Sequence, residues 1–271
     1  GWRGCLAAVV CALPFVLGFV VPVWVLVDNA WSVGTRGMDA RFVGAIRATL
    51  MLAAMAAATT VLLGLVLAFA RRMRALPFID PVVRLAGLGY AIPGTVLAIG
   101  LLIPLAAADV IINDGAVRFL GLSPGQLLAG TWLTLLIAYV VRFAAIPLGT
   151  IDAGLQRISP NIDAAARTLG ESRTSMLVRV HVPILLPALG AAGLMVFVDT
   201  MKELPATLLL RPFNVETLAT LVYSKASTYE FGDAAVAALA IVVVGLAPVM
   251  WLHRAIALGR GTRRPGPGNG V

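Results

Sequence analysis

Long apolar runs separated by short polar segments are the main pattern of the chain. Each run has the roughly 20 or more residues that a helix needs to cross the hydrocarbon core of a bilayer. The pattern therefore predicts an all-α polytopic membrane protein with six transmembrane helices. These helices are expected at about 5–27, 44–70, 83–107, 126–147, 184–210 and 234–257.

Composition excludes a soluble globular protein. Hydrophobic residues make up 60% of the 271 residues and charged residues only 13%, whereas soluble domains carry about 25% charged residues. The net charge of +8 is spread over the edges of the apolar runs, which disfavours a nucleic-acid interface. Cys5 and Cys11 form no CxxC pair, so we expect packing residues rather than a disulfide or a metal site.

The distribution of basic residues predicts that both termini lie in the cytoplasm. With that orientation, 14 of the 21 Lys and Arg residues fall on the cytoplasmic side, as the positive-inside rule requires. The cytoplasmic set is Arg3, Arg71, Arg72, Arg74, Arg84, Arg142, Arg157, Arg167, Arg173, Arg179, Arg254, Arg260, Arg263 and Arg264. The segment 148–183 is then cytoplasmic.

This segment contains "SPNIDAAARTLG" (159–170), which has the signals of a short helix. Ser159 suits the N-cap and Pro160 the first helical position. Asp163 falls in the first turn, near the positive end of the helix dipole. Gly170 is placed to end the helix.

The predicted short helix is amphipathic. Ile162, Ala166 and Leu169 recur at i, i+4 and i+7 and predict one apolar stripe. Such a stripe either docks into a groove of another protein or lies on the membrane surface. A second helix is expected to begin near Ser172, with an apolar side made of Met176, Leu177 and Val180.

The stretch "AAARTLG" (164–170), nine residues and then "VHVP" (180–183) resembles the EAA loop of binding-protein-dependent ABC importer permeases. The family pattern is E-A-A, three residues, Gly, nine residues and I-x-L-P. Ala165, Ala166, Gly170 and Pro183 match it, and Val180 and Val182 are conservative replacements. Ala164 stands where the family has glutamate. Asp163 carries a carboxylate one position earlier, about 100° around a helix.

The resemblance implies that residues 152–183 form a coupling loop, whose helix sits in a cleft of an ATP-binding subunit. The implied coupling residues are Asp163, Ala164, Ala165, Ala166, Arg167, Leu169, Gly170 and Pro183. Implied partners are ATP-binding cassette subunits, a periplasmic substrate-binding protein, membrane lipid and a second six-helix half, in the same chain or as a second copy. The implied location is the bacterial inner membrane.

ATP and Mg²⁺ are expected on the partner subunit, with no cofactor bound by this chain. Its two lysines, Lys202 and Lys225, are not part of a GxxxxGK[ST] phosphate-binding loop. The protein is therefore expected not to be an enzyme. An intramembrane protease or channel is the alternative from another class, and no GxSxG motif supports a protease.

"KELPATLLLRP" (202–212) followed by "TLA" (217–219) resembles the ferric-iron permeases among these importers. Those permeases often fuse two six-span halves, and this sequence resembles the second half. The absence of an initial methionine fits that expectation. Permeases for thiamine, phosphonates, polyamines and sulfate are the alternatives.

Asp199, Lys202 and Glu203 lie at i, i+3 and i+4 and are predicted to share one helix face inside an apolar region. In one interpretation Glu203 and Asp199 line the translocation path, where their oxygens suit a hard cation. In the other, an ion pair with Lys202 fixes the packing of the span. Pro205 is expected to break or kink the helix, and Thr207 completes the candidate path.

The expected domain organisation is one six-helix domain (1–258) and a disordered basic tail (259–271). His181 and His253 are far apart and form no HxxxH pattern, so a zinc site is not predicted. His181 is expected to be solvated or to lie at an interface.

Overall fold

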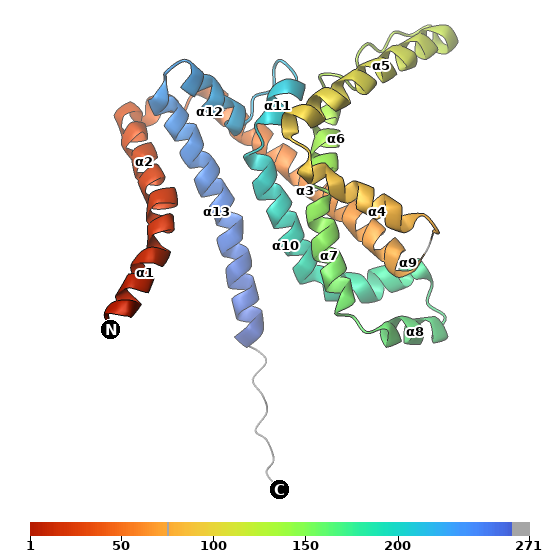
Figure 1. The fold of residues 1–271 in the computed structure, drawn as a ribbon. Helices are drawn as coiled ribbons and strands as arrows, with labels where there is room; N and C mark the ends of the chain where they lie inside the picture. Colours follow the sequence, from red (N-terminus) through yellow and green to blue (C-terminus); the bar gives the residue numbers. More distant parts are fainter. Residues whose placement is uncertain (75, 262–271) are drawn as a thin grey trace. The chain divides into compact units, whose positions relative to one another are not determined.

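The computed structural model describes the backbone of residues 1–74 and 76–261, and their side chains except for 35, 248, 249 and 251–261 (Figure 1). All regular elements in this part are helical. The chain divides into two compact units, Gly1–Leu50 with Asn214–Val244, and Met51–Phe213 with Gly245–Val271. The predicted tail lies outside the described residues from position 262 onward.

The helices follow one another without intervening strands in the described chain. They are α1 (Trp2–Phe15), α2 (Val21–Val33), α3 (Ala40–Arg72), α4 (Ile79–Leu88), α5 (Gly94–Leu120), α6 (Trp132–Phe143), α7 (Ala145–Gln156), α8 (Pro160–Thr168), α9 (Arg173–Met176), α10 (Val182–Met201), α11 (Pro205–Leu210), α12 (Leu218–Ser227) and α13 (Phe231–Gly261). Two π-helical stretches, Val16–Val20 and Leu177–His181, join α1 to α2 and α9 to α10.

The first unit contains α1, α2, the start of α3, α12 and the start of α13. Its core packs Phe42 and Ala45 of α3 against Leu218 and Leu221 of α12, together with Val236 and Ala237 of α13. α1 and α2 contribute no buried residue. Because the exposed surface of α1 and α2 is largely apolar, the two helices suit contact with lipid or with another membrane helix.

Two ion pairs of Lys225 link the end of α12 to the start of α13. Lys225 Nζ lies 2.5 Å from Glu230 Oε2 and 3.0 Å from Asp233 Oδ2. Hydrogen bonds, first to Glu230 and then to Asp233, raise the pKa of Lys225. The chain reverses here through Tyr229, whose φ is +63°.

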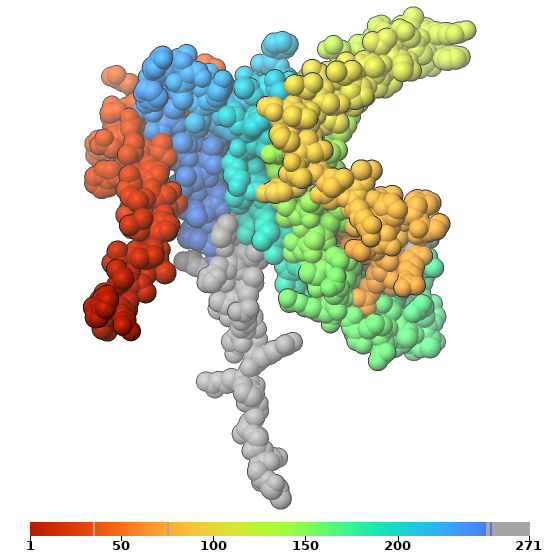
Figure 2. All heavy atoms as spheres, viewed as in Figure 1, coloured from red at the N-terminus to blue at the C-terminus, as the bar shows by residue number. Residues whose placement is uncertain are grey.

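The second unit is built around α7 and α10, which pack along each other. Leu155 and Ile151 of α7 meet Leu185 of α10 and Leu65 of α3 in one buried cluster. A second cluster joins α3, α5, α6, α10 and α11 around Tyr139 and Leu135. The outer half of α5 projects away from this core (Figure 2), and its Ile111 and Phe119 are exposed.

The apolar runs predicted from the sequence correspond to helices, but several boundaries were wrong. The expected span 83–107 is divided between α4 and α5, because Ile92 before Pro93 is extended (ψ 129°). The expected span 126–147 begins at Trp132 and continues, through a bend of 47°, into α7. The expected span 184–210 starts earlier and breaks after Met201.

Four described helical stretches are long and apolar enough to cross a membrane: Trp2–Val33, Ala40–Arg72, Gly94–Leu120 and Arg173–Met201. The bent pair α6 and α7 would make a fifth span, and the apolar part of α13, Phe231–Ala247, is shorter. The number of six spans stays a prediction.

The break between α4 and α5 depends on a glycine. A Cβ at Gly89 would overlap the carbonyl oxygen of Val141 on α6. We expect Gly89→Ala to destabilise the fold by about 1–3 kcal/mol, because α6 cannot move without disturbing its core contacts. Thermal unfolding in detergent should show a lower apparent Tm. Gly87→Ala is the control, since a Cβ there meets no atom within 4 Å, and an equal loss in both variants would contradict the packing explanation.

Candidate functional site: two arginine–carboxylate clusters in the second unit

The short helix predicted at 159–170 exists as α8, and both of its ends are capped as its sequence indicates. Ser159 Oγ accepts a hydrogen bond from the Asn161 N–H (3.3 Å). At the other end Gly170 has φ +79°. The Gly170 N–H donates to the Arg167 carbonyl (3.0 Å) and the Glu171 N–H to the Ala166 carbonyl (3.1 Å), the pair of bonds that defines a Schellman motif.

The apolar stripe predicted for α8 is present in part. Ile162 and Leu169 are exposed, Leu169 by 82%, as expected for a stripe that this chain does not cover, whereas Ala166 is buried against Phe69 and Met176. The inner face of α8 is formed instead by Asp163 and Ala166, one helical turn apart. The second helix does begin after Ser172, whose Oγ accepts from the Ser175 N–H. Met176, Leu177 and Val180 lie on one side, as predicted, and this side packs against Phe69 and Ala166.

Asp163 is buried and paired with an arginine. Its Oδ2 accepts from Nε of Arg72, at the end of α3, at 2.8 Å. The same guanidinium donates to the carbonyl oxygens of Leu155 and, at 2.9 Å, Ile158, where α7 ends. Helix-end carbonyls lack partners within their own helix, so Arg72 satisfies them and fixes α8 next to α3 and α7 at once.

His181 completes this first cluster from the start of α10. It is fully buried, which makes the expectation of a solvated or interface residue wrong. Its Nε2 lies 2.9 Å from Asp163 Oδ1, with an N–H direction outside hydrogen-bond geometry, and its ring packs edge-on against Phe69 at 5.2 Å. Asp163 therefore contacts two basic side chains from two different helices.

A second cluster lies where the chain breaks between α10 and α11. Glu203 Oε2 is 3.0 Å from Arg142 Nε of α6, and both side chains are largely buried. Glu203 Oε1 also accepts from the Ala206 N–H (3.2 Å), and Arg142 Nη1 donates to the Ile92 carbonyl (2.9 Å). The pair thus joins α6, the start of α5 and the α10–α11 break in an apolar part of the molecule.

The break itself is held by a chain of hydroxyl groups. Thr207 Oγ1 donates to the Glu203 carbonyl (2.6 Å) and lies 2.6 Å from the Tyr139 hydroxyl of α6. Pro205 is the first residue of α11, a position where its missing N–H costs nothing. The predicted helix interruption near Pro205 is therefore present, and the break precedes the proline.

The shared helix face predicted for Asp199, Lys202 and Glu203 is wrong, because α10 ends at Met201. Lys202 Nζ pairs with Asp199 Oδ1 at 2.8 Å, and the lysine side chain is 65% exposed. Glu203 turns away from both and pairs with Arg142. The structure therefore separates the three charges into one pair with an exposed lysine and one buried pair.

Sequence reasoning missed several residues of these clusters. Arg142 was assigned to a cytoplasmic segment, although it follows ten apolar or hydroxyl residues, and a charge inside such a run signals a buried role. Asp109, on α5, was not singled out. It is buried and accepts hydrogen bonds from the N–H groups of Leu127, Leu128 and Ala129, which shape the loop before α6.

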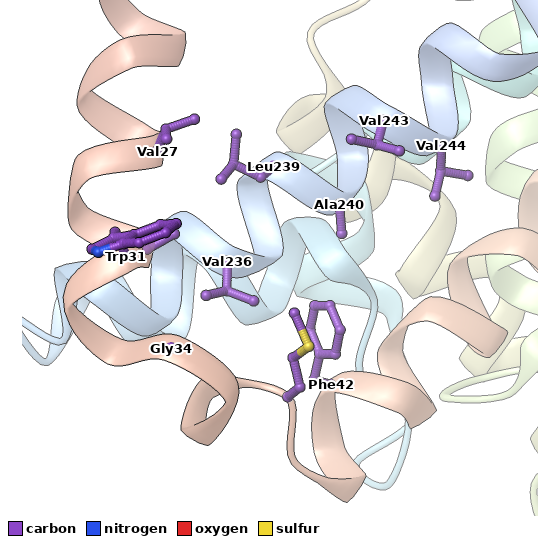
Figure 3. A pocket seen from close by; sticks show the side chains of 11 residues that line it. Val27, Trp31, Gly34, Phe42, Val236, Leu239, Ala240, Val243 and Val244 are labelled. Carbon is purple, nitrogen blue, oxygen red and sulfur yellow. The ribbon is translucent and has the colours of Figure 1, made fainter.

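The first unit contains a large apolar pocket of about 740 Å³ (Figure 3). Val27 and Trp31 of α2, Phe42 of α3 and Val236 and Leu239 of α13 are among its lining residues. No charged side chain lines it, so its chemistry suits a hydrocarbon surface. In the described residues no group of three His, Cys, Asp or Glu side chains could hold a metal ion.

Curated relatives are transport permeases. The chain is 27% identical over 248 residues to the Fe(3+)-transport system permease protein FbpB 2 of Haemophilus influenzae, covering 89% of this chain and 45% of the relative. It is 28% identical over 152 residues to the protein of Salmonella typhimurium named as 2-aminoethylphosphonate transport system permease PhnV, covering 56% and 57%. The chain therefore spans about half the length of the curated relatives it matches.

Solved structures show the same fold. A bacterial alginate ABC transporter in complex with an alginate pentasaccharide-bound periplasmic protein contains a chain that superposes with a TM-score of 0.69 at 17% identity, covering 93% of this chain and 91% of the other. No protein-family model matches the chain. In sequence and in fold the chain is similar to permeases of ABC importers, which confirms the resemblance inferred from its sequence.

Proposed function

We propose that the chain is a transmembrane permease half of an ATP-driven importer in a bacterial inner membrane, with both termini in the cytoplasm. The observation that carries the proposal is the similarity to a ferric permease over 89% of the chain, together with the importer fold. A second six-helix half, ATP-binding cassette subunits and a periplasmic binding protein complete the assembly. ATP and Mg²⁺ belong to the cassette subunits, and this chain has no catalytic role.

Residues 152–183 are proposed to couple the permease to the ATP-binding subunit. α8 presents Ala164, Ala165 and Leu169 outward, with Arg167 beside them. Its inner face is fixed to α3, α7 and α10 by Arg72, Asp163 and His181. A displacement of α8 would thus be transmitted to α3, α7 and α10 through buried contacts and not through a flexible loop.

Ferric iron is the proposed solute, because the ferric relative matches much more of the chain than the phosphonate relative does. A 2-aminoethylphosphonate is the second candidate, supported by the similarity to PhnV. The path is proposed to pass the break between α10 and α11, near Asp199, Lys202, Glu203, Pro205 and Thr207. A cation that reached Glu203 would compete with the Arg142 guanidinium for the carboxylate.

Purification of the tagged chain from its native membrane in mild detergent tests the assembly. We expect an ATP-binding subunit and a periplasmic binding protein to co-purify, and the binding protein to bind ferric iron more tightly than 2-aminoethylphosphonate. Tighter binding of 2-aminoethylphosphonate would make it the proposed solute in place of ferric iron. Absence of both partners, under conditions that preserve a known importer, would contradict the importer proposal.

Gly170→Val is expected to uncouple transport from ATP hydrolysis. A Cβ at Gly170 meets no atom, so the cost arises only from φ +79°, which a β-branched residue rarely adopts. The end of α8 should therefore rearrange, and solute uptake per ATP hydrolysed should fall severalfold while membrane insertion is unchanged.

Two variants control for this prediction. Gly170→Asn should couple normally, because asparagine tolerates positive φ. Gly121→Val places the same residue at another open helix end, φ +66°, far from the loop in sequence, and should leave the ratio of uptake to hydrolysis unchanged. Normal coupling in Gly170→Val would contradict the role of α8.

The role of the Arg142–Glu203 pair can be separated from its contribution to stability. Glu203→Gln alone leaves a buried guanidinium without its counter-charge, and we expect a loss of about 3–5 kcal/mol. The double variant Arg142→Gln/Glu203→Gln removes both charges and should recover most of the lost stability. If the carboxylate also acts on the solute, the double variant will stay defective in uptake.

Thermal unfolding and vesicle uptake, measured on the same preparations, check this prediction. Asp80→Asn is the matched control, because it replaces a carboxylate by its amide in the exposed Arg71–Asp80 pair and should cost no more than about 1 kcal/mol. Full recovery of uptake in the double variant would show that the pair is structural only.

A further inference from the structure

A cationic cavity lies between the end of α3, α8 and α9. It has a volume of about 340 Å³, within the range of small-ligand sites. Four guanidinium groups line it, from Arg72, Arg74, Arg167 and Arg173, against the two carboxylates of Asp163 and Glu171. The lining therefore carries an excess of positive charge from elements that are separate in sequence.

The two carboxylates are already engaged. Asp163 is bound by Arg72 and contacts His181, and Glu171 lies 3.6 Å from Arg179. Arg167 uses its Nε on the Asp163 carbonyl at 3.2 Å. Arg74 and Arg173 form no ion pair with a described residue. Since like charges around one cavity repel, an anion bound there would stabilise the arrangement.

The guanidinium groups of the lining favour an anionic ligand with phosphate-like oxygens. Guanidinium groups bind phosphate through paired N–H donors, in a geometry that a lysine cannot supply. All four cations of the lining are arginines. A carboxylate of a partner protein would satisfy fewer donors than a phosphate.

The position of the cavity points to a lipid. Arg72 is the last residue of α3, one of the helical stretches long and apolar enough to cross a membrane. Leu76 and Phe78, just beyond Arg74, are exposed by 46% and 55%. Basic residues beside exposed apolar side chains at the end of a span suit the surface of an anionic leaflet.

We propose that this cavity binds the phosphate of an anionic phospholipid headgroup. The bound headgroup would join the end of α3 to α8 and α9. Binding does not depend on the proposed transport function. Only its consequence, a stiffer attachment of α8 when anionic lipid is present, rests on that proposal.

Native mass spectrometry of the purified full-length chain, titrated with phosphatidylglycerol or with phosphatidylcholine of the same acyl chains, tests the site. We expect the first phosphatidylglycerol to bind more tightly than phosphatidylcholine. In Arg74→Gln/Arg173→Gln its affinity should fall about 30-fold, at roughly a factor of five for each arginine near a membrane surface.

Arg84→Gln/Arg157→Gln is the matched control, since it removes the same charge from two exposed arginines outside the cavity lining. Its affinity should stay unchanged. Arg74→Lys/Arg173→Lys keeps the charge and controls for a folding defect. Its affinity for phosphatidylglycerol should lie between those of the wild type and the Arg74→Gln/Arg173→Gln variant. Equal losses in both glutamine variants, equal binding of the two lipids, or displacement of the lipid by inorganic phosphate at the same concentration would each overturn the proposal.

Discussion

Arg72 is the residue on which the position of α8 depends. Its guanidinium donates hydrogen bonds to two carbonyl oxygens at the end of α7 and to the buried carboxylate of Asp163. Without the arginine, the buried Asp163 carboxylate would keep only its contact with His181, and the Ile158 carbonyl would lose its arginine donor, at a cost above that of an exposed pair. A short helix of nine residues, with little apolar surface of its own, is thereby held in one orientation.

The two clusters use the same physical solution at different places in the second unit. In each, an arginine from one helix binds a buried carboxylate from another element and also a backbone carbonyl near a helix end. Breaks expose backbone groups that an apolar environment does not solvate. The arginines supply donors to these carbonyl oxygens.

The sequence was sufficient for the ends of α8 and the start of α9, and insufficient for helix faces. Ser159, Gly170 and Ser172 act through local hydrogen bonds and backbone conformation, which depend on neighbouring residues only, and all three were predicted. Ala166, Glu203 and His181 were misplaced because their surroundings come from residues far along the chain. For Glu203, one early helix end at Met201 was enough to turn the carboxylate towards Arg142.

The position of Asp163 changes how a coupling contact would be made. Ala164, at the position where the resemblance expects glutamate, is exposed, and Asp163, about 100° away around the helix, is buried against Arg72. A carboxylate on α8 is therefore not offered to a partner. The exposed residues nearby are Arg167 and Leu169, so docking on an ATP-binding subunit would require an acidic or apolar counterpart. The negative charge of α8 is used within this chain, where it connects the helix to α3 and α10.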